Sequence, residues 1–247
     1  MKKLLASDYD GTLSRNRQIL PQDKAAIEEW QRAGNLFCLC SGRGPLSAIA
    51  EMERCELHPD LLICSNGASA IDMNGNFIFR HKLPPQAPRK IFALAHEYAV
   101  TAFNGQTYNG ELHQHSYIDP TRVTIGMEDL LKLEDFLQFN AVFTGSQADA
   151  DAFSDRVDQE LKEITAHRNG VYIDCSVAGV DKGTGVAEIA AHFGIALENC
   201  YTIGDNNNDL AMLLPYHGAV IETGNPLTIQ KVGHPVPDIA SFIQEIL

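Results

Sequence analysis

The 247-residue sequence is poor in positive charge and has no long apolar run. Its 19 lysines and arginines stand against 32 aspartates and glutamates, which gives a formal net charge of −13. Binding to nucleic acid or to anionic membranes needs a basic surface, so this deficit argues against both partners. No segment approaches the ~20 apolar residues that span a bilayer, and the first residues are too polar for a signal-peptide core. We therefore expect a cytoplasmic protein that binds neither nucleic acid nor membrane.

The cysteines also lack a recognisable pattern. The six residues, at positions 38, 40, 55, 64, 175 and 200, contain no CxxC pair and no disulfide-framework spacing. Cys38, Cys40 and Cys64 fall inside apolar, strand-like runs, where a free thiol behaves as a small hydrophobic group. We expect all six to be reduced, as is usual in the cytosol.

Strand-like and helix-like segments alternate through the first third of the chain. Apolar runs that predict buried strands are separated by segments with helical periodicity, which end at Gly34 or begin at Pro45. The expected strands cover residues 2–9, 36–41 and 61–65, and the expected helices cover residues 22–34 and 45–55. Continuous apolar strands joined by helices predict a parallel sheet with helices on both faces, which is the α/β class.

The middle of the chain has a different character. Two short apolar runs around Asn74-Gly75 predict a hairpin, and the proline-rich segment 82–88 follows as a candidate linker. Amphipathic helices are expected at 89–100 and 149–164, among strands such as 140–145 and 170–177. The strand–helix alternation resumes near Val180. We expect a core formed by residues 1–82 and 181–247, split by an inserted α+β domain at 83–180.

Polar residues follow several of the core strands. Asp8 and Asp10 end the first strand, and Ser41, Gly42 and Arg43 end the second. A third group, Asp205 to Asp209 with the sequence DNNND, follows the strand at 200–205, and Lys182 begins a predicted helix. Because ligands of open parallel sheets bind beyond the carboxyl ends of the strands, these residues are expected to share one site.

Four carboxylates at one sheet edge need a compensating charge, since like charges that lie close together repel one another. Mg²⁺ suits a site with a few carboxylates and a substrate phosphate. A hydroxyl, an ammonium group and free backbone amides are what phosphate oxygens require. The residues therefore predict a metal-assisted site for a phosphorylated ligand.

Four motifs carry a family resemblance. The stretches DYDGT, CSGR, DKGTG and GDNNND occur in the order and spacing of the four motifs of the haloacid dehalogenase (HAD) superfamily. The hairpin, the inserted middle domain and the C-terminal stretch resemble the Cof-type sugar-phosphatase branch. The resemblance implies a Rossmann-like core and an inserted cap domain that closes over the site. The chain departs mildly from the pattern at Tyr9, where the family often has Leu or Ile.

The resemblance also implies a role for each matched residue. Asp8 would be the nucleophile that forms an aspartyl-phosphate, and Asp10 would be the general acid–base. The phosphate-binding residues would be Ser41, Gly42, Lys182 and Asn208, and the Mg²⁺ ligands would be Asp8, the backbone carbonyl of Asp10, Asp205 and Asp209.

The implied activity is a Mg²⁺-dependent phosphatase acting on a small phosphorylated metabolite, such as a sugar phosphate or a nucleotide. A phosphotransferase or phosphomutase that shares the phosphoenzyme is an alternative, and a catalytically inactive phosphate-binding module is another. Residues 103–117, with the sequence FNGQTYNGELHQHSY, are candidates for the lining of the cap.

Several other residues have ordinary structural interpretations. Arg43 fits a surface ion pair as well as it fits a site contact. Asn206 and Asn207 are expected to serve turn and cap chemistry, as are Asn66 and Gly67. His113 and His115 are expected on an exposed strand, and Trp30 in the core.

Overall fold

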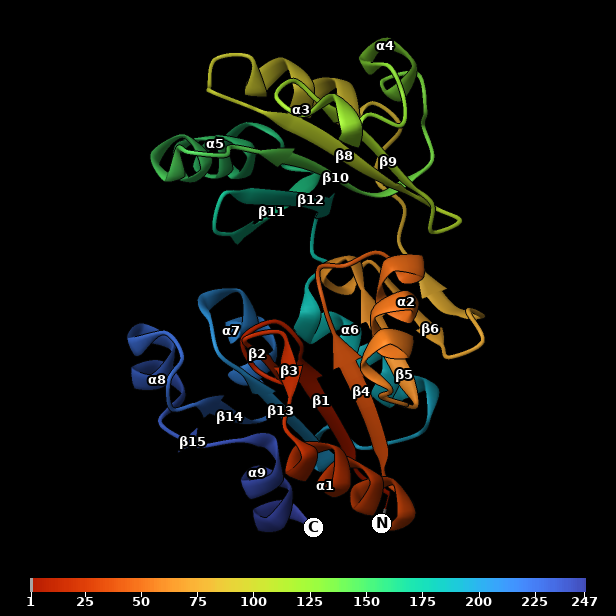
Figure 1. Ribbon diagram of the computed structural model, residues 1–247, viewed down its shortest axis with the longest axis vertical. Helices are drawn as coiled ribbons and strands as arrows, with labels where there is room; N and C mark the ends of the chain where they lie inside the picture. Colours follow the sequence, from red (N-terminus) through yellow and green to blue (C-terminus); the bar gives the residue numbers. More distant parts are fainter. Residues whose placement is uncertain (1) are drawn as a thin grey trace. The chain divides into compact units, whose positions relative to one another are not determined.

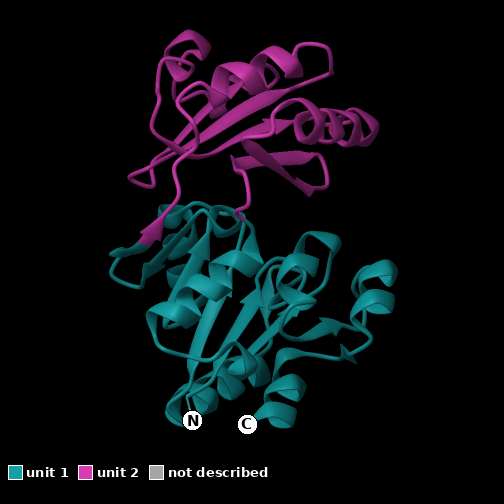
Figure 2. Cartoon of the chain, turned by 180° about the vertical axis from the view of Figure 1, so that it is seen from behind, with its two compact units in different colours: residues 1–78, 181–247 teal, residues 79–180 magenta. Residues whose placement is uncertain are grey.

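The structure is a computed structural model that describes residues 2–247. The chain divides into two compact units, residues 1–78 with 181–247 and residues 79–180 (Figure 2). The first unit is therefore built from two separate stretches of chain.

The first unit is organised by a mainly parallel sheet with the strand order β15-β14-β13-β1-β4-β5-β6-β7 (Figure 1). Its strands are β1 (Leu4–Asp8), β4 (Leu36–Cys40), β5 (Leu61–Cys64), β6 (Ser69–Asp72), β7 (Phe77–Arg80), β13 (Cys200–Gly204), β14 (His217–Ile221) and β15 (Pro235–Val236). The pairs from β15 to β5 are parallel, whereas β6 runs antiparallel to β5. The parallel sheet predicted from the continuous apolar runs is confirmed.

Helices cover both faces of this sheet. The helices of the first unit are α1 (Pro21–Arg32), α2 (Pro45–Cys55), α6 (Lys182–His192), α7 (Leu210–Leu213), α8 (Pro226–Val232) and α9 (Ile239–Ile246). Leu62 of β5 joins the hydrophobic cluster formed with α1, α2 and α9. Its neighbour Ile63 points to the other face, where it lies against Gly185 of α6. Because successive strand residues face opposite ways, one short apolar strand serves both layers.

Short elements complete the first unit. They are the hairpin of β2 (Ser14–Arg15) and β3 (Gln18–Ile19) and the 3₁₀ turns η1 (Ser65–Gly67), η3 (Leu197–Asn199) and η4 (Asn207–Asp209). The turn η4 is followed directly by the four-residue helix α7. The side chain of Asn206 caps the turn by accepting a hydrogen bond from the N–H of Asn207.

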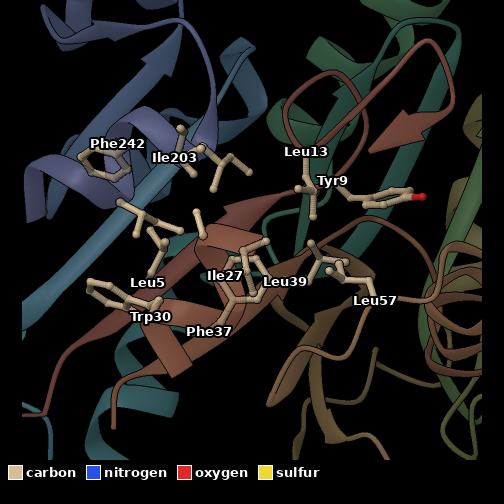
Figure 3. Close-up of a cluster of buried hydrophobic side chains, with 14 of the residues drawn as sticks. Leu5, Tyr9, Leu13, Ile27, Trp30, Phe37, Leu39, Leu57, Ile203 and Phe242 are labelled. Carbon is tan, nitrogen blue, oxygen red and sulfur yellow. The ribbon is translucent and has the colours of Figure 1, made fainter. Parts of the chain in front are cut away.

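Trp30 of α1 belongs to the hydrophobic core, as expected (Figure 3). It is fully buried among residues that include Ile27 and Phe37, and its ring N–H donates to the carbonyl of Leu36 at 2.8 Å. Burying a side chain of this kind contributes about 1.5–3 kcal/mol to folding. The ring of Tyr9 joins the same cluster, but its hydroxyl points away from it (Figure 3).

The second unit contains a five-stranded antiparallel sheet with the order β11-β12-β10-β8-β9. Its strands are β8 (Ala102–Thr107), β9 (Leu112–Ser116), β10 (Phe136–Val142), β11 (Ile164–Asn169) and β12 (Tyr172–Val177), and its helical elements are α3 (Ala87–Ala95), η2 (Pro120–Arg122), α4 (Met127–Leu130) and α5 (Gln147–Glu160). Side chains from α3 and α5 form its hydrophobic cluster with one face of the sheet. The expected α+β character of the insertion is confirmed.

Some boundaries differ from the predictions. Helix α3 begins at Ala87, inside the proline-rich segment 82–88, because Pro88 takes a place in the first turn, where its missing N–H is harmless. Helix α5 ends at Glu160, and the expected end at Ile164 is instead the start of β11.

All six cysteines are free, and Cys38, Cys40 and Cys64 are buried as expected. His113 and His115 lie on β9, an edge strand, where both are half-buried. Within residues 2–247, no helix has the length and hydrophobicity to cross a bilayer.

Candidate active site

The site is built around the turn that follows β1. Asp8 is the last residue of this strand and is buried. The chain then turns back, with the N–H of Ser14 donating to the carbonyl of Tyr9 at 2.8 Å. Gly11 adopts a φ of +96°, and a Cβ there would lie 2.5 Å from the Asp205 carboxylate. Only glycine combines this backbone conformation with so close an approach, so the turn lies directly against Asp205.

Lys182 joins two of the predicted acids. Its Nζ donates to Asp8 Oδ1 and to Asp209 Oδ1, both at 2.6 Å, and its side chain is 2% exposed. The residue opens α6, whose start is fixed by a capping box between Asp181 and Thr184. The cap determines where the helix begins and so which residue extends toward β1. Two stretches of chain 174 residues apart are thereby joined by a buried ion pair.

Asp209 is held from both sides. Its second oxygen, Oδ2, accepts hydrogen bonds from the backbone N–H groups of Asp205 at 3.0 Å and Asn206 at 3.1 Å. Gly204 permits this arrangement because a Cβ at that position would lie 2.6 Å from the same oxygen. With Lys182 on Oδ1, both oxygens of Asp209 have partners, and its carboxylate orients the loop after β13.

Asp205 completes a cluster of three carboxylates. One oxygen each from Asp8, Asp205 and Asp209 lies within 4.8 Å of the others. Asp205 Oδ1 also accepts a hydrogen bond from Thr12 Oγ1 at 2.9 Å. Sequence reasoning did not include Thr12 in the site, although its place in the DYDGT motif was the available signal.

The cluster has more negative charge than its single lysine balances. Burial, followed by the Asp209 carboxylate, raises the pKa of Asp8 to about 8 despite the opposing effect of Lys182. Burial and Asp209 also raise the pKa of Asp205. Asp8 Oδ2 is buried and has no hydrogen-bond partner within the described chain. An orphaned carboxylate oxygen beside two further acids fits a hard divalent cation, which prefers oxygen ligands.

Asp10 occupies a different environment. Its side chain is 58% exposed and receives hydrogen bonds at 3.1 to 3.3 Å from Nε and Nη2 of Arg43. The guanidinium of Arg43 also lies 5.4 Å from the centre of the Tyr9 ring, whose hydroxyl donates to Glu51 at 2.6 Å. Arg43 therefore forms an ion pair, as one of the two interpretations expected, and its partner is a predicted site residue. The Asp10 side chain does not belong to the carboxylate cluster.

Three of the predicted phosphate-binding residues follow strands at the same carboxyl edge of the sheet. Ser41 and Gly42 directly follow β4, and Asn208 lies in η4 after β13. Ser41 is buried, and its hydroxyl accepts a hydrogen bond from the N–H of Arg43 at 3.2 Å. The structure thus places these residues at the predicted edge, and their binding of phosphate stays a prediction.

The turn at Asn66 and Gly67 makes a close contact with the start of α6, which the sequence did not indicate. Ser65 and Asn66 both have positive φ values, as expected for a tight turn. Gly67, at a φ of +100°, is so close to α6 that a Cβ would lie 2.0 Å from the carbonyl oxygen of Asp181. The turn therefore packs against the residue that precedes Lys182, which makes it part of the support of the site.

Comparison with known proteins identifies a family and several relatives that this chain resembles. A family model of haloacid dehalogenase-like hydrolases matches residues 5–233. The 5-amino-6-(5-phospho-D-ribitylamino)uracil phosphatase YcsE of Bacillus subtilis is 26% identical over 239 residues, covering 93% of this chain and 86% of that protein. A second phosphatase of the same name from that organism, YwtE, is 24% identical over 286 residues, with coverages of 99% and 98%.

Solved structures show the same fold. The phosphatase BT1666 of Bacteroides thetaiotaomicron superposes with a TM-score of 0.80 at 22% identity, covering 100% of this chain and 93% of that one. The HAD subclass IIB sugar phosphatase BT4131 gives a TM-score of 0.83 at 19% identity, with coverages of 99% and 98%. The family match spans the strand ends that carry the carboxylates and Lys182. This chain therefore belongs to the haloacid dehalogenase-like hydrolases.

Proposed function

We propose that the protein is a Mg²⁺-dependent phosphatase that hydrolyses a small phosphorylated metabolite through an aspartyl-phosphate on Asp8. The observation that carries the proposal is a cluster of three carboxylates, two of which share the buried Lys182. One oxygen of Asp8 in this cluster has no hydrogen-bond partner within residues 2–247. Such an excess of negative charge is stable only beside a further cation or with a bound proton. A structural ion pair would not need the second and third acids.

In the proposed first step, the Asp8 carboxylate attacks phosphorus and the bond from phosphorus to the ester oxygen breaks. Asp10 supplies the proton that the departing alcohol takes up. In the second step Asp10, now a carboxylate, accepts a proton from water as that water attacks the aspartyl-phosphate. Inorganic phosphate leaves and Asp8 is restored. The exposure of Asp10 suits a group that exchanges protons with water, and Arg43 holds its carboxylate in one orientation.

The transferring phosphoryl group needs donors on its oxygens. Lys182 has three N–H bonds and uses two of them on Asp8 and Asp209, which leaves one for phosphate. We propose that the Ser41 hydroxyl, the Gly42 backbone N–H and the Asn208 amide supply the others. Such donors contribute most where charge develops in the transition state.

The metal would be held by the carboxylates of Asp8, Asp205 and Asp209, together with the backbone carbonyl of Asp10. When bound, Mg²⁺ would supply positive charge that offsets the repulsion between the carboxylates and the phosphate. The raised pKa values of Asp8 and Asp205 support this assignment, because both acids favour protonation when no second cation is near.

The test is hydrolysis of p-nitrophenyl phosphate by the purified chain with Mg²⁺ present. We expect EDTA to abolish the activity and added Mg²⁺ to restore it. Asp8→Asn should be inactive, and Asp10→Asn should accumulate phosphorylated protein that intact-mass spectrometry detects. Asp129→Asn, at an exposed ion pair of the second unit, is the matched control and should behave as the wild type. Full activity in Asp8→Asn would remove the proposed nucleophile.

An assay of hydrolysis across a panel of phosphorylated metabolites would identify the substrate. The names of the two Bacillus relatives specify a phosphate ester on a ribityl chain, so this compound belongs in the panel beside sugar phosphates and nucleotides. Adding sugar acceptors to the assay separates a phosphatase from a phosphotransferase. Only a phosphotransferase would return a phosphorylated acceptor in place of inorganic phosphate.

A further inference from the structure

Tyr9 stands between the two acids of the DYDGT motif, and its two ends lie in different environments. Its ring is fully buried in the hydrophobic cluster of the first unit, whereas its hydroxyl leaves that cluster (Figure 3). The hydroxyl donates a hydrogen bond to Glu51 Oε1 at 2.6 Å. A leucine or isoleucine, which the family often has at this place, could fill the same apolar space but could not make this contact. The tyrosine therefore ties the turn after β1 to α2, the helix that carries Glu51.

The Glu51 carboxylate is fixed by two residues. Besides the hydrogen bond from Tyr9, it accepts one from Nε of Arg54 at 3.0 Å and one from Nη2 of Arg54 at 2.7 Å. The Glu51 side chain is 17% exposed. An arginine that donates to both oxygens of a carboxylate makes a stronger and more directional contact than a single hydrogen bond does. Glu51 is therefore a negative charge with a set position beside the Tyr9 hydroxyl.

The Arg43 guanidinium lies where these groups attract it. Its central carbon is 5.4 Å from the centre of the Tyr9 ring, within the ~6 Å at which an aromatic face attracts a cation. Burial opposes the charged form of Arg43, but the Asp10 carboxylate and, after it, Glu51 raise its pKa on balance. The ring of Tyr9 and the carboxylates of Asp10 and Glu51 therefore all attract the same guanidinium.

The backbone of Arg43 is fixed as well. Its N–H donates to the Ser41 hydroxyl at 3.2 Å, and its carbonyl accepts a hydrogen bond from the N–H of Ser65 at 2.8 Å. Because the backbone is held, the orientation of the guanidinium depends on what attracts the side chain. The Tyr9 ring and the Glu51 carboxylate supply part of that attraction.

Asp10 depends on Arg43 for its orientation. Its side chain is 58% exposed, and within residues 2–247 the guanidinium supplies every hydrogen bond that the carboxylate receives. An exposed ion pair holds a carboxylate only weakly when nothing fixes the geometry of the cation. A group that takes a proton from one particular water molecule needs a defined orientation. The groups that hold Arg43 can provide it.

We propose that Tyr9 and Glu51 are positioning residues that orient Asp10 through Arg43, an inference that rests on the proposed function. Asp10 takes a proton from the attacking water as the new oxygen–phosphorus bond forms and the bond to Asp8 breaks. When the guanidinium loses the Tyr9 ring or the Glu51 charge, Asp10 adopts orientations from which it cannot take this proton. The departure of p-nitrophenolate needs no proton, because this leaving group is stable as an anion near neutral pH. With p-nitrophenyl phosphate the loss therefore falls on the second step.

The test measures the two steps separately. A rapid-mixing burst of p-nitrophenolate reports phosphorylation of the protein, and intact-mass spectrometry of quenched samples follows the decay of the phosphorylated form. We expect Tyr9→Leu to slow this decay about tenfold, a part of the ~10²–10⁴-fold that a positioned acid–base group contributes. The rate of the burst should not change. Because decay then limits turnover, kcat and KM should fall together, while kcat/KM, which reports the steps up to release of p-nitrophenolate, stays the same.

Two further variants separate the contributions of the ring and the charge. Tyr9→Phe keeps the ring that faces Arg43 and removes only the hydrogen bond to Glu51, so its decay rate should lie between those of the wild type and Tyr9→Leu. Glu51→Gln removes the negative charge without altering the hydrophobic cluster, and it should also slow the decay. It tests the inference independently if Tyr9→Leu does not fold.

Tyr201→Leu and Glu53→Gln are matched controls. Tyr201 packs against the same hydrophobic cluster, and Glu53 is exposed on α2. Tyr201→Leu should lower the stability to urea and leave the decay rate unchanged, and Glu53→Gln should change neither. A purely structural role for Tyr9 predicts that Tyr9→Leu behaves as Tyr201→Leu does, with lower stability and a normal decay rate.

The outcomes distinguish this inference from the proposed function. If neither the wild type nor Asp10→Asn forms phosphorylated protein, the proposed function fails and this inference fails with it. If the aspartyl-phosphate forms but Tyr9→Leu and Glu51→Gln hydrolyse it at the wild-type rate, the two residues do not position Asp10 and the proposed function stands. An equal slowing of the burst and the decay would also overturn the inference, because it would indicate a general distortion of the site.

Discussion

Replacing Lys182 by methionine tests the electrostatic account of the site most directly. Methionine has nearly the length of lysine but no charge, so the change removes two hydrogen bonds of 2.6 Å and leaves the packing largely intact. The Asp8 and Asp209 carboxylates then remain buried without their shared cation. Breaking a buried pair in this way costs about 3–5 kcal/mol, because the remaining charge is uncompensated.

Protonation of Asp8 should keep the loss of unfolding free energy at the lower end of that range. Burial and Asp209 already raise the pKa of Asp8 to about 8 in the presence of Lys182. Without the lysine the pKa rises further, and a protonated Asp8 needs no cation. We therefore expect Lys182→Met to lose about 3 kcal/mol of unfolding free energy at pH 7. The difference from the wild type should shrink as the pH falls from 10 to 7, through the pKa of Asp8, since a protonated acid gains nothing from the lysine.

The assay is urea unfolding followed by tryptophan fluorescence. The chain has one tryptophan, Trp30, which is fully buried in the same unit as Lys182, so its signal reports the unfolding of that unit. Lys231→Met is the matched control, because Lys231 is exposed in the last turn of α8. It should change the stability by no more than a few tenths of a kcal/mol, about the effect of a surface charge.

One result would refute this reasoning. If Lys182→Met and Lys231→Met were equally stable at pH 7, Lys182 would not be compensating buried carboxylates. The same would hold if the loss for Lys182→Met stayed constant between pH 10 and pH 7. The first result contradicts the ion pair itself, and the second contradicts its coupling to protonation.

Three further predictions concern the support of the site. Gly67→Ala should lose more stability to urea than Gly34→Ala, because both positions have positive φ but only a Cβ at Gly67 would strike a backbone oxygen, at 2.0 Å; equal losses would contradict the close approach. Hydrogen bonds from Arg54 lower the pKa of Glu51 to about 2, so Glu51 stabilises the fold above pH 4.5 and this contribution of about 1 kcal/mol disappears as the pH falls toward 2. The gap between wild type and Glu51→Gln should close over that interval, and a gap independent of pH would count against the ion pair. Mg²⁺ should raise the urea midpoint of the wild type and not of Asp205→Asn, and an equal rise in both would place the metal elsewhere.

Much of the secondary structure of the first unit could be predicted from the local pattern of apolar residues. Apolar runs of strand length between helical periodicities predicted β1, β4 and β5 with α1 and α2, because burial on both faces of a parallel sheet demands such runs. The motifs predicted which strand ends carry chemistry. The antiparallel sheet of the second unit was harder to predict, because β11 follows α5 after a short connection and its pattern continued that of the helix.

The partners of the site residues could not be read from the sequence. Thr12 and Asp205 are 193 residues apart, and Asp10 and Arg43 are 33 apart. The sequence offered two equal interpretations of Arg43 because a side chain's neighbours depend on how the loops close above the sheet. The same applies to Gly67, whose contact with Asp181 exists only once α6 has docked on the sheet.

The sequence by itself determined which residues are acids, donors and strand ends, since these are properties of composition and periodicity. Only the tertiary structure decided that Lys182 serves two carboxylates and that one oxygen of Asp8 has no hydrogen-bond partner among the described residues. It also decided that carboxamides of β8 and β10 lie opposite one another. Strand register and helix docking set these contacts. Both are fixed by packing over long stretches of chain, which no local window of sequence contains.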